Sequence, residues 1–437
     1  MNPEFVRNLW LEATPFRLAL IAGVLLLVFA ALSVSPFGAA AASVAQLIYW
    51  FFTVLWGTRS AALSVVGEIR ERTWDSQKLS SIGPVEMVWG KLLGATIHAW
   101  FGGLLCLPAV LWPIVRTQGA GAALTQGATM LLLALLAQAV ALLSSLVLVR
   151  RNTGNWRLDT FLCQVAGIAA AYSFHSLWRS VQILTGSETL DWWGLTFGSA
   201  QFHLVSLVLF TAWALVGCWR AMRTELRLSN GPFVWLAWLL FLFFYQAGFA
   251  AMLPAGLSAM EPQGAVLRLM LGGLALIGSA YSMVFLEPKE PVRLRWLGEQ
   301  LRAGRLWRAF AGLDAWMLSY GATLVVGLAL VLLVAMDRQD SMPGLALAVL
   351  AMLGFLTRDV AVFVLFGRIA GGKGDFAALA VLAALYLLVP MVLKGGPLAA
   401  LFLPVPGSLL SPIAGWTQAM GVVWWAKRSI SPSFTRR

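Results

Sequence analysis

Residues 68–91 read EIRERTWDSQKLSSIGPVEMVWGK, a charged segment in a chain where charge is scarce. Apolar runs lie on both sides of it, at about 45–66 and about 91–115. Because polar side chains are costly in hydrocarbon, we expect such a segment to leave the bilayer as a short loop or helix. The stretch therefore predicts a membrane protein in which two neighbouring spans are joined outside the lipid.

The composition of the whole chain favours the same class of protein. Of its 437 residues, 60% are hydrophobic and 11% are charged, and the mean hydropathy is +0.80. A soluble domain has roughly 25% charged residues, and an apolar run of about 20 residues can cross the bilayer as a helix. We predict an all-α integral membrane protein with about twelve transmembrane helices. The apolar runs lie at about 18–34, 45–66, 91–115, 125–149, 160–178, 197–219, 233–256, 264–286, 314–336, 344–366, 376–394 and 409–426.

The distribution of lysine and arginine predicts the orientation. With a cytoplasmic N-terminus, the basic residues on the outer side would be Arg116, Arg179, Arg338 and Lys394. The opposite orientation would place the dense basic clusters outside and violate the positive-inside rule. We therefore predict that both termini are cytoplasmic. Inner-loop basic residues that meet anionic lipid also account for the net charge of +12 without a nucleic-acid partner.

The segment before the first span has a helical pattern of its own. Phe5, Leu9 and Ala13 share one helical stripe, with Arg7 and Glu12 elsewhere. This pattern predicts a short helix in the membrane interface, and a disordered tail is the alternative.

Within 68–91, the sequence predicts a helix–turn–helix elbow. Charged residues extend the preceding span, and Gly83-Pro84 turns the chain because proline disfavours the helical conformation in the residue before it. A second short piece, 85–89, then leads into Gly90-Lys91. Such an elbow could present a compact surface to a cytosolic partner, whereas an ordinary solvated loop is the simpler interpretation.

The elbow resembles the cytoplasmic loop of ABC transporter permeases of the type-2 exporter class. Thr73-Trp74-Asp75, Glu86 and Gly90-Lys91 fit the family's pattern, as does Leu79. Arg72 stands where the family often has Gly, and Ser81 where it often has Pro. The resemblance covers 68–91 well and, through a six-span layout, residues 1–228 loosely.

The resemblance implies the membrane-spanning permease subunit of an ATP-driven exporter in a bacterial cytoplasmic (inner) membrane. It implies coupling to a cytosolic ABC ATPase through Glu68, Arg70, Glu71, Arg72, Thr73, Trp74, Asp75, Leu79, Glu86 and Lys91. The sequence has no G-x-x-x-x-G-K-[ST] phosphate loop, so ATP and Mg would bind that separate ATPase. We expect no cofactor and no enzymatic activity in this chain. The alternative function is a non-transporting membrane scaffold or regulator with a permease-like fold.

We predict two six-span halves, 1–228 and 229–437. Thr357-Arg358 before Gly367 weakly repeats Thr58-Arg59 before Gly67, although chance similarity would also explain this. After Gly367 the second half has a short loop without the acidic, turn-containing pattern. Because only the first half then carries a coupling loop, we predict a homodimer in which each 68–91 segment engages one ATPase.

Ionisable residues within the spans are the candidates for a polar path. Arg59, Arg358 and Asp359 qualify because a charge at a helix centre costs about 2.5–3.5 kcal/mol on insertion scales. Their alternative role is to anchor helices or snorkel to the interface. Arg358 and Asp359 need not pair, since i,i+1 neighbours point apart on a helix. The histidines lack zinc-ligand spacing, so no metal site is predicted.

Overall fold

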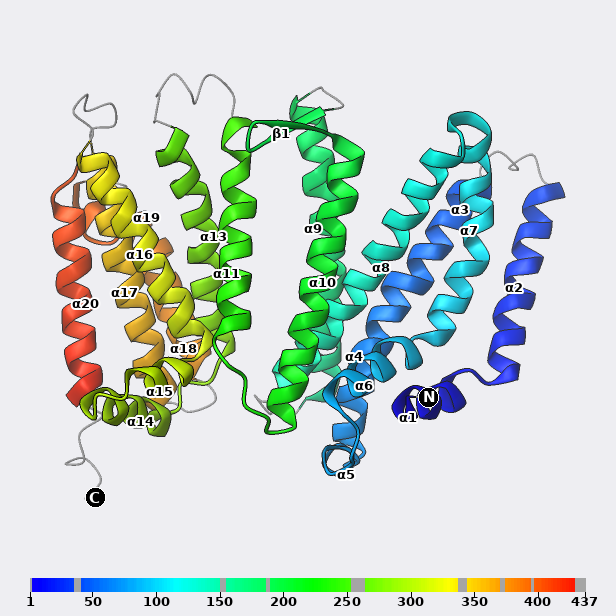
Figure 1. Cartoon of the computed structure of the whole chain (residues 1–437), viewed down its shortest axis with the longest axis horizontal. Helices are drawn as coiled ribbons and strands as arrows, with labels where there is room; N and C mark the ends of the chain where they lie inside the picture. The colour runs from blue at the N-terminus through cyan, green and yellow to red at the C-terminus, as the bar shows by residue number, and fades with distance from the viewer. Residues whose placement is uncertain are drawn as a thin grey trace. The chain divides into compact units, whose positions relative to one another are not determined.

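The computed structural model describes residues 2–34, 41–149, 155–185, 189–252, 264–336, 344–369, 374–393 and 397–428. These residues are mostly helical, and the strands among them form one hairpin, β1 (Thr189–Trp192) with β2 (Leu195–Gly198). The chain divides into two compact units (Figure 1). Unit 1 contains Met1–Leu190 and Phe197–Asn230, and unit 2 contains Asp191–Thr196 and Gly231–Arg437.

Ten helical segments of the described residues are long and apolar enough to cross a membrane, which confirms an all-α membrane protein. They are Pro15–Leu32, Ala41–Arg70, Ile97–Gln118, Ala120–Leu148, Ser199–Glu225, Phe233–Ala250, Gly264–Leu286, Ala315–Ala335, Leu345–Gly367 and Gly374–Val392. The runs at about 160–178 and 409–426 also form long helices, α9 (Trp156–Thr185) and α20 (Leu410–Arg428), which are not among these ten. The count of twelve spans therefore stays a prediction. Two basic residues of the orientation argument, Arg338 and Lys394, lie outside the described residues, and Arg179 is described only as backbone.

Unit 1 consists of a short N-terminal helix, long helices and the elbow between the second and third long helices. Its helices are α1 (Pro3–Glu12), α2 (Pro15–Val34), α3 (Ala41–Trp50), η2 (Phe51–Trp56), α4 (Gly57–Arg70), α5 (Trp74–Lys78), α6 (Pro84–Trp89), η3 (Gly90–Gly94), α7 (Ile97–Gln118), α8 (Ala120–Val149), α9 and α10 (Ser199–Glu225). Helices α3, η2 and α4 form one continuous 30-residue segment. Helix α1, Pro3–Glu12, confirms that the segment before the first span forms a short helix, and its place in the membrane interface stays a prediction.

The π-helix η2 is fixed by two glutamines from neighbouring helices. Gln138 Nε2 of α8 donates to Thr53 O at 2.8 Å, and Gln164 Nε2 of α9 donates to Leu55 O at 2.8 Å. A widened helical turn in the membrane needs such partners, because lipid offers none to backbone groups. The glutamines therefore tie the middle of the second long helix to α8 and α9.

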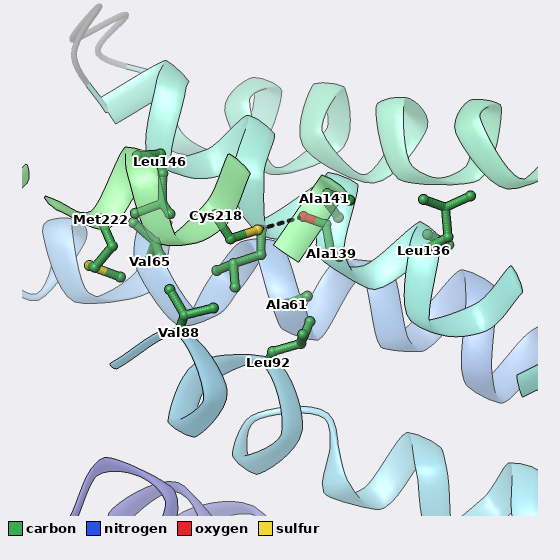
Figure 2. Close-up of a cluster of buried hydrophobic side chains, with 14 of the residues drawn as sticks. Ala61, Val65, Val88, Leu92, Leu136, Ala139, Ala141, Leu146, Cys218 and Met222 are labelled. Carbon is green, nitrogen blue, oxygen red and sulfur yellow. Dashed lines mark hydrogen bonds between the residues drawn. The ribbon is translucent and has the colours of Figure 1, made fainter. Parts of the chain in front are cut away.

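The core of unit 1 is built largely from small and aliphatic side chains (Figure 2). Cys218 Sγ of α10 donates to Ala139 O of α8 at 3.2 Å. A Cβ on Gly167 would lie 2.4 Å from Ala137 O, so α9 approaches α8 at backbone distance. Small residues allow such approach between membrane helices. Val88 of α6 and Leu92 of η3 belong to the same core, so the elbow is packed onto the spans.

Unit 2 consists of long helices and a pair of short helices outside them. Its helices are α11 (Phe233–Ala247), η4 (Gly248–Met252), α13 (Gly264–Leu286), α14 (Pro291–Arg302), α15 (Leu306–Ala311), α16 (Ala315–Ala335), α17 (Leu345–Ile369), α18 (Gly374–Ala383), η6 (Ala384–Leu388), α19 (Val389–Val392), η7 (Pro397–Leu401) and α20. Helix α17 is the most buried of the ten apolar segments. It packs closely on α20, where a Cβ on Gly354 would lie 2.9 Å from Trp416 N.

Candidate functional site

The elbow begins where α4 ends in a left-handed residue. Arg72 has φ +59°, Thr73 N donates to Glu68 O at 2.9 Å, and Arg72 N donates to Ile69 O at 3.1 Å. These two bonds form a Schellman motif, whose left-handed position glycine fills most easily. The position is the one at which the permease family often has Gly. The sequence therefore departs there from the pattern that it resembles, while the backbone keeps a conformation that glycine favours.

The rest of the elbow follows the predicted order of helix, turn and helix. Helix α5 covers Trp74–Lys78, and α6 begins at Pro84 directly after the Gly83 turn. Gly83 N donates to Glu86 Oε2 at 3.2 Å, so the carboxylate satisfies a backbone donor at the start of α6. The prediction of a Gly83-Pro84 turn is confirmed.

A buried lysine ties the elbow to the helix before it. The Lys91 side chain is 0% exposed, and its Nζ donates to Glu68 Oε2 at 2.5 Å, Gln77 Oε1 at 3.0 Å and Ser64 O at 3.0 Å. Gln77 Nε2 in turn donates to Glu68 Oε1 at 2.5 Å. The ends of α4, α5 and η3 therefore meet at one charged, hydrogen-bonded point.

Helix α1 completes this point with a second acid and a second base. Glu4 Oε1 lies 3.2 Å from Lys91 Nζ and 2.8 Å from Arg7 Nη2, and Arg7 also pairs with Glu68. We call Glu4, Arg7, Glu68, Gln77 and Lys91 the buried frame. Its two acids and two bases carry no net formal charge, which lowers the cost of burying them.

Two glycines of η3 allow α1 to pack closely on the elbow. A Cβ on Gly90 would lie 2.5 Å from Glu4 Cγ, and a Cβ on Gly94 would lie 2.7 Å from Asn8 Cβ. Asn8 Nδ2 also donates to Gly90 O at 3.3 Å. Helix α1 thus buries a polar face, Glu4 and Asn8, against the protein, while Trp10 and Leu11 are exposed.

The sequence-predicted coupling residues separate into two groups. Trp74 and Lys91 are buried, with the Lys91 ammonium 5.3 Å from the centre of the Trp74 ring, and Glu68 is mostly buried in the frame. The exposed group consists of Arg70, Glu71, Arg72, Thr73, Asp75, Leu79 and Glu86. Leu79 is 89% exposed, and we call this exposed group the outer side of the elbow. Buried members can shape the elbow, and exposed members can touch a partner.

Sequence reasoning missed three members of the buried frame, Glu4, Arg7 and Gln77. A signal for Gln77 was present, since it lies three residues after Trp74 and shares its helical face. Glu4 and Asn8 are likewise four residues apart on one polar face of α1. Nothing in the sequence indicates that this face packs against Gly90 and Gly94.

The intramembrane candidates occupy different environments. Arg59 is exposed at the surface of unit 1. Arg358 in unit 2 is buried, and its Nε donates to Asp359 Oδ1 at 2.8 Å. The two adjacent residues pair directly, although i,i+1 side chains point apart on a helix, because the long guanidinium side chain can bend back to its neighbour.

Other polar groups complete the Arg358–Asp359 pair. Tyr281 and Tyr386 each donate a hydroxyl hydrogen bond to Asp359 Oδ2 at 2.7 Å, and Arg358 Nη1 donates to Gln418 Oε1 at 2.8 Å. These side chains come from α13, η6, α17 and α20. The cluster joins four elements of unit 2, and each carboxylate oxygen of Asp359 is already occupied.

The histidines show no shared ligand geometry. His98 and His203 are buried, and His175 is exposed. In the parts of the chain that the structure describes, no three His, Cys, Asp or Glu side chains gather in a way that could hold a metal ion. Comparison with protein-family models, curated proteins and solved structures finds no match to this chain.

Proposed function

We propose that the chain is the membrane-spanning permease subunit of an ATP-driven ABC exporter, and that it couples to a separate ATPase through 68–91. The observation that carries the proposal is the two-sided construction of the elbow. Its inner side is fixed to α4, η3 and α1 by the buried frame, and its outer side exposes charged and polar groups around Leu79. A force on the outer side would therefore reach the adjoining ends of two long helices directly.

The outer side suits a cytosolic protein. It offers both signs of charge, a hydroxyl and one exposed leucine within a few residues. Mixed charge gives a partner specificity and orientation, and an exposed leucine supplies an apolar anchor. ATP and Mg would bind that partner, in keeping with the missing phosphate loop.

The proposed topology has twelve spans and both termini in the cytoplasm of a bacterial cell. Helices α9 and α20 would be the two spans beyond the ten apolar segments. Their lengths, 30 and 19 residues, are sufficient to cross the hydrocarbon core. Helix α20 ends with Lys427 and Arg428, and such basic residues favour the inner side of the membrane.

The proposed polar path, Arg59 with Arg358 and Asp359, requires rearrangement in unit 2. Asp359 already accepts hydrogen bonds from two tyrosines and Arg358. A substrate group could reach this carboxylate only if one of those partners moves. The cluster therefore also suits the alternative function, a membrane scaffold or regulator that keeps a fixed structure.

The decisive experiment is affinity purification of the full chain from its native cell, with the bound proteins identified by mass spectrometry. We expect an ABC-type ATPase to co-purify with the wild type. Glu71→Lys with Asp75→Lys should reduce its recovery at least tenfold, since two exposed carboxylates on the outer side are reversed. Asp191→Lys with Glu299→Lys reverses two exposed carboxylates outside the elbow and should leave recovery unchanged.

Two outcomes would count against the proposal. Equal recovery of the ATPase with both double variants would exclude docking at the elbow. If the reconstituted complex hydrolyses ATP but transports no compound across the membrane, the scaffold function would be better supported than the exporter function.

A further inference from the structure

Unit 2 carries two short helices between α13 and α16, outside its long spans. Helices α14 and α15 lie at the end of the unit where α20 ends (Figure 1). They expose large apolar side chains: Val292 is 74% exposed, Leu306 68% and Trp307 66%. Trp296 and Leu301 are also exposed. This apolar surface is unusual for a segment that would otherwise face water.

The two helices are nevertheless held firmly on the unit. Leu297 and Ala309 are buried beneath them, and the Trp296 ring packs where a Cβ on Gly312 would lie. Arg293 Nη2 pairs with Asp314 at 2.9 Å and donates to Gly312 O at 3.1 Å. Burial raises the pKa of Asp314, and Arg293 opposes that shift. The exposed apolar groups are therefore displayed by a fixed support.

The same surface is strongly basic. Between 291 and 311 the sequence has five arginines, Arg293, Arg295, Arg302, Arg305 and Arg308, and one acid, Glu299. Arg302, Arg305 and Arg308 are exposed, and within the described residues they make no ion pair. Unpaired arginines beside tryptophan and leucine are typical of a helix that lies in the membrane interface.

The elbow of unit 1 provides a comparison within the same chain. Both segments follow the second long helix of their unit and precede the third, and both contain two short helices. The exposed residues of the elbow mix acids, bases and a hydroxyl with apolar side chains such as Leu79 and Val85. The surface of α14 and α15 also exposes apolar side chains, but its charged residues are five arginines and one acid. Equivalent places in the order of helices therefore carry surfaces of different chemistry.

We propose that α14 and α15 form an anionic-lipid binding surface. Arg302, Arg305 and Arg308 bind the phosphates of anionic phospholipids, while Trp307, Leu306 and Val292 enter the boundary between headgroups and acyl chains. Arginine suits phosphate because its planar guanidinium can donate two parallel hydrogen bonds. The proposal depends on the membrane-spanning fold and does not depend on coupling to an ATPase.

Depth measurement tests the position of the surface. A nitroxide label is placed at Leu306→Cys, or at Leu79→Cys on the elbow as the matched control, in full-length protein in lipid nanodiscs. The native cysteines Cys106, Cys163 and Cys218 are buried. We expect the label at 306 to be more accessible to oxygen than to a water-soluble nickel complex, and the label at 79 to show the reverse. Equal, water-like accessibility at both positions would overturn the proposal and favour a protein partner for α14 and α15.

Lipid competition tests the chemistry. Nanodiscs of phosphatidylglycerol and phosphatidylcholine are used, and the lipid that stays bound is counted by native mass spectrometry. Each basic residue near an anionic surface strengthens binding roughly fivefold. The triple variant R302Q/R305Q/R308Q should therefore lose its preference for phosphatidylglycerol by at least tenfold. The control R70Q/R72Q/R227Q removes three exposed arginines from unit 1 and should cause a clearly smaller loss, because acidic residues neighbour these arginines in the sequence. Equal losses in both triple variants, or no loss in either, would overturn the proposal.

Discussion

Lys91 is the residue on which the elbow most depends. It is fully buried and close to two carboxylates, Glu4 and Glu68, as well as the Gln77 amide. A buried ion pair can contribute little net stability compared with apolar residues, but removal of one partner leaves an uncompensated buried charge. Glu4, Glu68 and Lys91, whose side chains are at most 13% exposed, are therefore costly to change singly.

Lys91→Met should lower the free energy of unfolding by about 3–5 kcal/mol, because Glu4 and Glu68 lose their shared cation. The measurement is SDS unfolding in mixed micelles, followed by tryptophan fluorescence. The double variant Glu68→Gln with Lys91→Met should recover part of the loss.

The matched control for that prediction is Lys78→Met on the same elbow. Lys78 pairs with Asp75 at 2.7 Å, but the Asp75 side chain is 88% exposed. An exposed pair contributes about 0–1 kcal/mol, so little change is expected. Similar losses for Lys91→Met and Lys78→Met would contradict the importance of the buried frame.

Among the elements, α1 shows how a short helix before the first span becomes part of the elbow. It packs on η3 because Gly90 and Gly94 have no side chains there. It also reaches α6, since Asn2 Nδ2 donates to Glu86 O at 2.6 Å. Helix α1 is thus a third helical piece beside α5 and α6.

Gly90→Ala should displace α1 from the elbow. The added Cβ would lie 2.8 Å from Phe5 N as well as against Glu4, and backbone atoms cannot simply rotate away. We expect a loss of about 1–3 kcal/mol in stability and faster hydrogen–deuterium exchange over 2–12.

Gly67→Ala on α4 is the control, because no atom lies within 4 Å of its added Cβ. Alanine is the better helix former by about 1 kcal/mol, so this variant should be as stable as the wild type or more so. Unchanged exchange over 2–12 in Gly90→Ala would show that α1 does not depend on this contact.

Sequence reasoning succeeded for elements that depend on local pattern. Apolar runs located the long helices because a membrane span needs about 20 consecutive apolar residues. Gly83-Pro84 located the turn because proline restricts the residue directly before it, whatever the rest of the fold does. The pairing of Glu68 with Lys91, and of both with α1, depends on how distant segments pack. The 30-residue length of α9 was also underestimated, since its flanks are polar.

For the whole molecule, the surfaces of the elbow and of α14 with α15 bear on how many copies of this chain the complex contains. The elbow has a surface suited to a protein, and α14 with α15 has one suited to lipid under the inference above. A single chain would then offer one ATPase docking surface, although an ATPase pair needs two. The homodimer predicted from the sequence meets that need.

We therefore expect the detergent-solubilised complex to contain two copies of this chain and two ATPase subunits. Native mass spectrometry or multi-angle light scattering measures this directly. One copy of the chain with two ATPase subunits would contradict the prediction. That result would direct attention to α14 and α15 as a second docking surface.

The two glutamines that bind η2 have a mechanical consequence. Gln138 and Gln164 hold carbonyl groups of the second long helix at fixed positions along its axis. Sliding that helix by a single residue would break both hydrogen bonds and leave polar groups unpaired in lipid. Small displacements of the elbow would consequently tilt α4, α8 and α9 together as one group, because the two hydrogen bonds keep these helices in register.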